Sequence, residues 1–163
     1  MSAAFVLARF TDSEKRLPAI RQLDNYAPVK RWDAVDGHFH LVLRVEGSAS
    51  ALPDAVRKLI GLQTVAAYDI IGNDNCGPDA PPDGTRAYIF VDAEPALKDG
   101  LLKTVREFPE TVCAASVKGG CDVVAVIQGE SIQSLERTIN EKIRPLNGVL
   151  RLKHNHIIDL KQL

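Results

Sequence analysis

Two adjacent glycines, Gly119 and Gly120, interrupt an apolar run, and Asp122 follows two residues later. Because glycine has no side chain, its backbone N–H group can approach a bound anion closely. A carboxylate at position 122 is the partner that an ammonium group requires. These residues have the chemistry to bind an amino acid, carboxylate to the glycines and amino group to Asp122. The alternative is structural, with the glycines forming a turn and Asp122 accepting hydrogen bonds from the loop.

A similar turn, Asp36-Gly37, lies between apolar segments in the first half of the chain. Gly119 and Gly37 are 82 positions apart (119 minus 37), about half of the 163 residues. At the same offset, His40 corresponds to Asp122 (122 minus 82). We therefore predict that one structural unit is present twice. Gly37 and His40 would then be the first-unit counterparts of the ligand-binding residues.

The histidines form two pairs, His38 with His40 and His154 with His156. Residues i and i+2 of a β-strand point to the same face, so each pair could bind a divalent metal ion. Each pair supplies only two ligands, without a glutamate or cysteine at ligand spacing. Ordinary hydrogen bonding at an interface or sheet edge is the alternative. We predict no cofactor.

Other polar residues are weaker candidates for a binding site. Arg44, Trp32 and Tyr68 could line a pocket in which the guanidinium binds a carboxylate, although a lone tryptophan is commonly a core or interface residue. The charged helix residues are interpreted as a solvated face without function. These are Glu136, Arg137, Glu141 and Lys142.

The sequence contains an odd number of cysteines, namely Cys76, Cys113 and Cys121, and no two of them form a C-x-x-C pair. This predicts neither a disulfide framework nor a zinc knuckle. A Gly-Gly turn pairs Lys118 with Cys121, so Cys113 and Cys121 would not be opposite each other. We expect both to be buried apolar residues in a reducing compartment.

The composition is that of an ordinary soluble globular protein, with 45% hydrophobic residues, 25% charged residues and a formal net charge of -1. Without a basic excess, direct nucleic-acid binding is not expected. The apolar run at residues 1–10 is too short for a signal peptide, and no segment approaches a membrane span. We predict a cytoplasmic protein with no membrane partner.

Hydrophobic periodicity predicts the order β-α-β-β-α-β twice, which is the ferredoxin-like α+β fold with antiparallel sheets. The expected units are residues 1–72 and 86–163, with a Pro/Gly-rich linker at 73–85. The expected first-unit elements are a strand at 3–10, a helix opened by the capping box Thr11–Glu14 and carrying Leu17, strands at 29–35 and 38–45, a helix at 52–60 and a strand at 64–71. The second-unit elements are a strand at 86–91, a helix at 95–108, strands at 111–118 and 121–128, a helix capped by Ser131, and a last strand from 148 toward 160.

The sheet face that carries Val124 and Val126 is apolar, which predicts that the two sheets pack face to face, within one chain or between chains. The second unit resembles the ligand-binding and oligomerisation (RAM) domain of the Lrp/AsnC regulators. The resemblance is carried by the segments 87–91, 117–123 and 147–151. It implies dimers formed by sheet stacking, larger rings, and amino-acid binding near the hairpin loop between dimers.

Members of this family usually carry a helix-turn-helix before the domain, but here the first predicted strand begins within a few residues of Met1. We therefore expect a stand-alone module in transcriptional regulation that responds to an amino acid-like effector and does not read DNA itself. Its protein partners would be copies of itself or a regulator of the same family. The alternatives are a small enzyme of the dimeric α+β barrel type (monooxygenase or haem-handling), with a His, Tyr or Trp between helices and sheet, and a purely structural oligomer.

Overall fold

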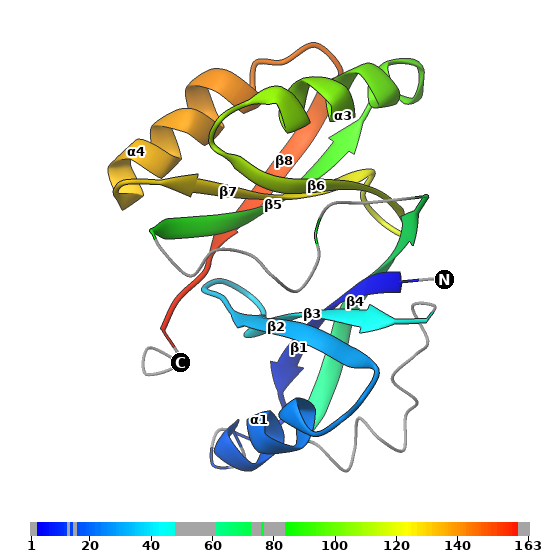
Figure 1. The fold of residues 1–163 in the computed structure, drawn as a ribbon, viewed down its shortest axis with the longest axis vertical. Helices are drawn as coiled ribbons and strands as arrows, with labels where there is room; N and C mark the ends of the chain where they lie inside the picture. The colour runs from blue at the N-terminus through cyan, green and yellow to red at the C-terminus, as the bar shows by residue number, and fades with distance from the viewer. Residues whose placement is uncertain are drawn as a thin grey trace. The chain divides into compact units, whose positions relative to one another are not determined.

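The computed structural model describes residues 3–12, 14, 16–47, 61–72, 76 and 84–159. The chain divides into two compact units, residues 1–69 with 158–163, and residues 70–157. Within these described residues, four antiparallel strands belong to each unit, and Figure 1 shows their arrangement. Among the described residues, no helix combines the length and the apolar character needed to span a lipid bilayer.

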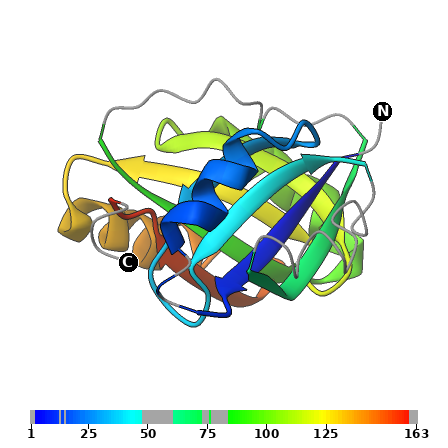
Figure 2. The ribbon, with the colours of Figure 1, turned by 90° about the horizontal axis from the view of Figure 1, so that it is seen from below.

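The first unit has the strand order β2-β3-β1-β4. Its described elements are β1 (Ala3–Phe10), α1 (Arg16–Asp24), β2 (Val29–Ala34), β3 (Leu41–Glu46) and β4 (Leu62–Ile71). Helix α1 lies across one face of the sheet (Figure 2). Its buried residues Ala19, Ile20 and Leu23 contribute to the core of this unit. The helix predicted at residues 52–60 lies outside the described residues.

The second unit has the corresponding order β6-β7-β5-β8. Its elements are β5 (Thr85–Ala93), the short 3-10 helix η2 (Pro95–Leu97), α3 (Lys98–Glu107), β6 (Thr111–Lys118), β7 (Val123–Gly129), α4 (Ile132–Arg137), the π-helical segment η3 (Thr138–Ile143) and β8 (Val149–His156). Helices α3 and α4 cover the same face of the sheet (Figure 1). The order of strands and helices is that of a ferredoxin-like unit, so the predicted fold class is confirmed.

The second unit is held together by a core between its helices and its sheet. The helix residues Leu101, Val105 and Leu135 are at most 4% exposed, and they pack in one cluster with strand residues such as Ile89 and Ile127. Burial of each such side chain contributes about 1.5–3 kcal/mol. Ser131 caps α4 as predicted, because its hydroxyl oxygen accepts a hydrogen bond from the Ser134 N–H at 3.0 Å.

The opposite sheet face is buried as well. Val124 is 0% exposed and Val126 is 1% exposed, and in the first unit Phe5 is also 1% exposed. The expectation that these apolar residues do not face open solvent is confirmed. The predicted packing of one sheet on the other stays a prediction.

Several backbone hydrogen bonds of the first unit recur in the second at an offset of 82 residues, for example from Val29 to Thr111 (111 minus 29). The recurring pairs, written donor to acceptor, are Tyr26 to Leu23 and Phe108 to Val105, Val29 to Tyr26 and Thr111 to Phe108, and Glu46 to Pro28 and Gln128 to Glu110. This is the offset that separates the two glycine turns in the sequence. The recurrence accompanies the same strand order in both units.

The start of α1 differs from the prediction. The Thr11 hydroxyl donates to the Gly61 carbonyl at 3.1 Å instead of capping the helix. The Asp12 carboxylate accepts the Glu14 N–H at 2.9 Å. The capping role of Thr11 is therefore wrong, because its side chain is used to join two segments 50 residues apart. Leu17, which the predicted helix carries, is 60% exposed.

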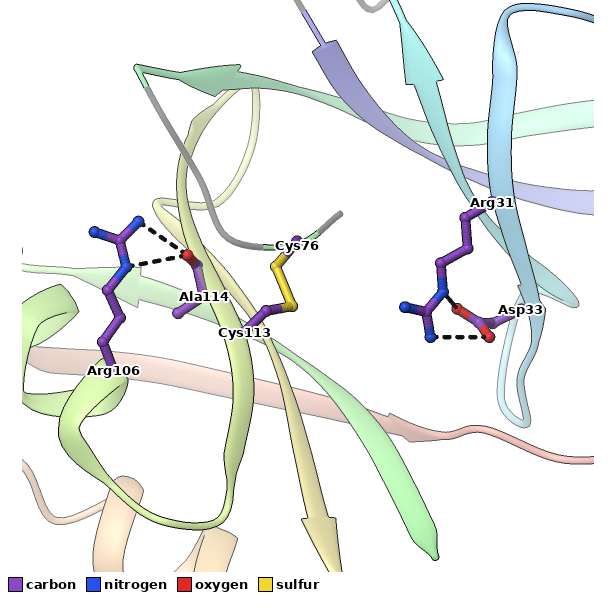
Figure 3. The surroundings of a disulfide bond; sticks show 6 residues. All are labelled: Arg31, Asp33, Cys76, Arg106, Cys113 and Ala114. Carbon is purple, nitrogen blue, oxygen red and sulfur yellow. Dashed lines mark hydrogen bonds and ion pairs between the residues drawn. A yellow bond between two sulfur atoms is a disulfide. The ribbon is translucent and has the colours of Figure 1, made fainter. Parts of the chain in front are cut away.

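A disulfide joins Cys76 to Cys113, with the two Cα atoms 5.0 Å apart (Figure 3). The prediction that no disulfide forms, and that Cys113 is only an apolar core residue, is wrong. Cys76 lies in the segment interpreted as a linker, where no periodic pattern indicates what it contacts. The remaining cysteine, Cys121, is a free buried thiol, as expected.

Candidate functional site

The glycine hairpin joins β6 to β7 in the predicted register. Its last backbone hydrogen bond runs from the Val117 N–H to the Asp122 carbonyl at 2.9 Å. The loop between them contains Gly119 (φ +120°) and Gly120 (φ +149°), conformations that side chains rarely adopt. Both glycines are exposed, so their backbone is accessible at the tip.

Asp122 fastens this hairpin to the end of β5. Its N–H donates to the Val91 carbonyl at 2.9 Å, and its carboxylate oxygen Oδ2 accepts the Ala93 N–H at 2.8 Å. The pairing of β5 with β8 shifts register between Asp92 and Ala93, so the side chain of Asp122 supplies an acceptor at an irregular part of the strand. Asp122 therefore has the structural role given as the alternative in the sequence analysis, because its carboxylate accepts a hydrogen bond from the backbone.

Charged groups surround the base of the loop. Lys98 donates from Nζ to the Val117 carbonyl at 3.2 Å, and Asp92 lies 3.7 Å from the Arg151 guanidinium. Burial raises the pKa of the Cys121 thiol to about 12, with the negative charges of Asp92 and Asp122 adding to the effect. Cys121 is therefore a protonated thiol at neutral pH and a poor nucleophile. Lys98 was not singled out from the sequence, because nothing in its local pattern places it at the hairpin.

His40 has the same position in the first unit as Asp122 in the second. Its N–H donates to the Ala8 carbonyl at 2.9 Å, and its carbonyl accepts the Val35 N–H at 2.9 Å. Its ring nitrogen Nδ1 accepts the Phe10 N–H at 3.0 Å. Gly37, in the loop before it, has φ +100°. In the first unit the His40 imidazole accepts a backbone N–H, as the Asp122 carboxylate does in the second unit.

The environment keeps this imidazole neutral. Burial lowers the pKa of His40, and the positive charges of Arg16 and Arg9 lower it further. The ring also stacks on Phe10, with the ring centroids 5.4 Å apart. Since Nδ1 accepts a hydrogen bond, we assign the proton to Nε2.

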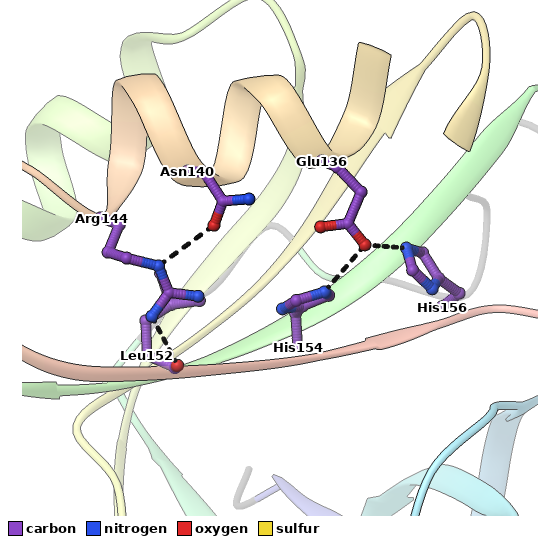
Figure 4. Close-up of polar contacts among 6 residues, drawn as sticks. All are labelled: Glu136, Asn140, Arg144, Leu152, His154 and His156. Atoms are coloured by element: carbon purple, nitrogen blue, oxygen red, sulfur yellow. Dashed lines mark hydrogen bonds and ion pairs between the residues drawn. The ribbon is translucent and has the colours of Figure 1, made fainter. Parts of the chain in front are cut away.

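The two histidine pairs differ. His38 lies in an exposed loop, because β3 begins only at Leu41. The predicted shared strand face of His38 and His40 is therefore wrong. His154 and His156 do share a face of β8, and Glu136 of α4 lies beside both (Figure 4). Glu136 was interpreted as part of a solvated face, but these contacts give its carboxylate two side-chain partners.

Trp32 does not join Arg44 and Tyr68, both of which lie opposite Phe5 in the strand pairing. Trp32 packs against the helix-side core and donates from Nε1 to Asp24 at 2.6 Å. The Arg44 guanidinium lies 6.0 Å from the ring centroid of Phe5. In the β2–β3 pairing, Trp32 is opposite Leu43, the neighbour of Arg44, so the two side chains point to opposite sheet faces.

The surface of the second unit has an open hollow of about 330 Å³ beside α3. Its lining residues are Ala96, Leu97, Gly100, Leu101, Thr104, Leu146 and Asn147. The enzyme alternative requires a pocket between helices and sheet that contains a His, Tyr or Trp. This hollow has none of them, and the alternative remains a prediction.

Residues 86–159 match the family model described as the Lrp/AsnC ligand binding domain. This part of the chain is similar to the Lrp/AsnC ligand-binding domains. The match includes the whole glycine hairpin and both histidines of β8. The resemblance read from the sequence of the second unit is confirmed.

A curated relative of this chain is the uncharacterized HTH-type transcriptional regulator PH0140 of Pyrococcus horikoshii. The two proteins are 30% identical over 76 residues, which are 47% of this chain and 48% of the relative. The chain therefore spans about half the length of the curated relative that it matches.

Several solved structures match nearly the whole chain, including those of two different proteins. The siroheme decarboxylase NirDL covers 98% of this chain and 71% of its own, with 7% identity and a TM-score of 0.74. An anthrone oxidase-like protein covers 97% of this chain and 91% of its own, with 13% identity and a TM-score of 0.53. At such identities the likeness shows the fold alone.

Proposed function

We propose that the chain is a ligand-binding and oligomerisation module that senses an amino acid or a similar small molecule in transcriptional regulation. The observation that carries this proposal is the match of residues 86–159 to the family model of the Lrp/AsnC ligand binding domain. The net charge of -1 supports a module that does not read DNA itself. The cytoplasm stays the proposed location, but the cysteines no longer support it, because Cys76 and Cys113 form a disulfide, a bond that is rare in reducing compartments.

The proposed ligand site is the glycine hairpin of the second unit. The N–H groups of Gly119 and Gly120 bind the ligand carboxylate, with the Lys98 ammonium at the base of the loop supplying positive charge. Asp122 binds the ligand amino group through the carboxylate that also accepts the Ala93 N–H. The site thus offers N–H groups and an ammonium group to the carboxylate of a zwitterion, and a carboxylate to its ammonium group.

The hairpin of the first unit provides a second, weaker subsite in this proposal. Gly37 takes the place of the glycine pair, and His40 takes the place of Asp122. A neutral imidazole carries no charge to attract an ammonium group, so this subsite binds a zwitterion less tightly. The recurrence of backbone bonds at an offset of 82 residues supports a tandem duplication of the unit.

We also propose that the module assembles with copies of itself or with a regulator of the same family. The family resemblance of the second unit supports this part of the proposal. Sedimentation velocity of the full chain, alone and with an effector, is expected to show a species larger than one chain. A single-chain mass at every concentration would contradict it.

The sensing proposal is tested by thermal unfolding of the full chain with each standard L-amino acid in millimolar excess. A ligand present at about 100 times its Kd adds about 2.7 kcal/mol of stability, which raises the unfolding temperature measurably. Absence of stabilisation by every amino acid would overturn the sensing role.

For an amino acid that binds, calorimetric titration of Asp122→Asn is the sharper measurement. The amide retains an acceptor for the Ala93 N–H and removes the negative charge, so we expect binding to weaken by about 10- to 100-fold. Glu107→Gln makes the same change at an exposed position of α3 and should leave the affinity unchanged. Equal affinities for both variants would place the ligand elsewhere.

A further inference from the structure

His154 and His156 lie two positions apart on β8, and both rings point to Glu136 of α4 (Figure 4). One carboxylate oxygen, Oε1 of Glu136, lies 3.1 Å from His154 Nε2 and 3.0 Å from His156 Nε2. The two imidazole rings are nearly perpendicular, with centroids 5.4 Å apart. Three potential metal ligands from two elements therefore converge on one point.

The backbone around this cluster is firmly held. In the pairing of β8 with β5, His154 is opposite Ile89 and His156 is opposite Ala87, and both β5 residues are completely buried. Leu135, which precedes Glu136, is completely buried in the core. The three side chains therefore project from rigid elements, as a preorganised site requires.

The end of the same helical segment is also tied to β8. The Arg144 guanidinium donates to the Leu152 carbonyl at 3.1 Å and to the Asn140 side-chain oxygen at 3.2 Å (Figure 4). These bonds fix the distance between the helical segment and the strand that together carry the cluster. The helical segment is thus held by the buried Leu135 at one end and by the Arg144 hydrogen bonds at the other. Strand β8 is held by its pairing with β5.

Two imidazole nitrogens and one carboxylate oxygen are a ligand set that Zn²⁺ and similar first-row ions bind in proteins. The three ligand atoms lie within 4.8 Å of one another. Ligands around a tetrahedral ion with bonds of about 2.0–2.1 Å are about 3.3 Å apart, close to the spacing of the carboxylate from both rings. Side-chain exposures of 24% for His154, 17% for His156 and 34% for Glu136 leave a path for an ion and a fourth ligand.

We propose that Glu136, His154 and His156 bind a divalent transition-metal ion, with Zn²⁺ as the first candidate. The fourth coordination position is open to water or to the carboxylate of a small molecule. This site uses no residue of the glycine hairpin. It is therefore independent of the proposed amino-acid site and survives a failure of that proposal.

The test is calorimetric titration of Zn²⁺ into tag-free full-length protein that has been treated with a chelator. We expect one saturable site per chain and a higher unfolding temperature with Zn²⁺ than without it. Cobalt offers a spectroscopic readout, because Co²⁺ in the same site gives visible absorption bands that depend on its ligands. Absence of saturable binding of both ions at micromolar concentration would overturn the proposal.

Variants separate a metal site from a hydrogen-bonded cluster. His154→Ala and His156→Ala should each weaken Zn²⁺ binding by at least about 100-fold, because loss of a direct ligand exceeds the effect of an outer-shell change. Glu136→Gln retains an oxygen that can accept from the imidazoles but is a poor zinc ligand, so it should weaken binding while the apo protein stays folded. His38→Ala, at an exposed loop position, is the matched control.

The outcomes decide the proposal even where a histidine variant fails to fold. In that case Glu136→Gln alone serves, with folding of its apo form checked by circular dichroism. Unchanged Zn²⁺ affinity in Glu136→Gln, or an equal loss in His38→Ala, would show that the ion binds elsewhere and would refute the site.

Discussion

Protonation of His40 is expected to destabilise the first unit. In the folded protein its ring nitrogen Nδ1 accepts the Phe10 N–H at 3.0 Å. A protonated imidazole has no acceptor, so the Phe10 N–H would face a second donor. Leaving a partly buried donor without a partner costs about 1–3 kcal/mol.

The direction of the pH dependence follows from the lowered pKa. Burial is the largest cause, and Arg16 and Arg9 add to it, so the folded-state pKa lies below the ordinary value of 6.5. The folded protein then binds fewer protons than the unfolded chain, and stability increases with pH in this interval. The contribution is fully present above about pH 6.5 and is lost as the pH falls through the folded-state pKa.

Urea unfolding followed by the fluorescence of the single tryptophan, Trp32, reports on this unit. His40→Asn places an acceptor near the position of Nδ1 and cannot be protonated. We expect it to remove part of the stability difference between about pH 7.5 and pH 5. His40→Ala should instead lose about 1–3 kcal/mol already at the higher pH.

His38→Asn is the control for this measurement, because it removes a histidine from the same loop at an exposed position. Its pH dependence should equal that of the unmodified protein. If His40→Asn also retained the complete pH dependence, protonation of His40 would not be its cause, and the assignment of Nδ1 as an acceptor would be refuted.

Two further predictions concern the second unit. A methyl group at Gly129 would lie 2.9 Å from the backbone nitrogen of Leu135, whereas one at Gly100 meets nothing within 4 Å. We expect Gly129→Ala to lose about 1–3 kcal/mol of unfolding free energy. Gly100→Ala lies in a helix and should gain about 0.5–1 kcal/mol. Equal stabilities of the two variants in urea would contradict the packing around Gly129. Reduction of the Cys76–Cys113 disulfide should lower stability by about 2–4 kcal/mol, whereas the double variant Cys76→Ser, Cys113→Ser should not respond to dithiothreitol.

The sequence predicts best where local rules decide the structure. Strand β6 has the predicted bounds, Thr111–Lys118, because a run of apolar residues leads into a turn that requires glycine. The Ser131 cap is similarly local. The failures involve partners distant in sequence. The amide of Phe10 and the imidazole of His40 are 30 residues apart.

Glu136 shows the same limit for the candidate metal site. From the sequence it belongs to a helix with charges at regular spacing, which favours a solvated face. Its contact with His154 spans 18 residues and depends on how α4 lies over β8. The disulfide is a further case, since Cys76 and Cys113 are 37 positions apart. Residue types identified His154 and His156 as possible ligands, but only the packing of helix on sheet brings Glu136 to them.

His40 and Asp122 have equivalent positions in the two hairpins, so their side chains can be compared directly. Both side chains accept a backbone N–H from the strand that lies beside the hairpin, that of Phe10 in one unit and that of Ala93 in the other. Any acceptor of suitable length satisfies this structural role, so the role alone does not require a charge. The carboxylate at position 122 adds a negative charge, and the burial of His40 keeps the other position neutral. Charge therefore distinguishes the hairpins, and a zwitterionic ligand should prefer the second.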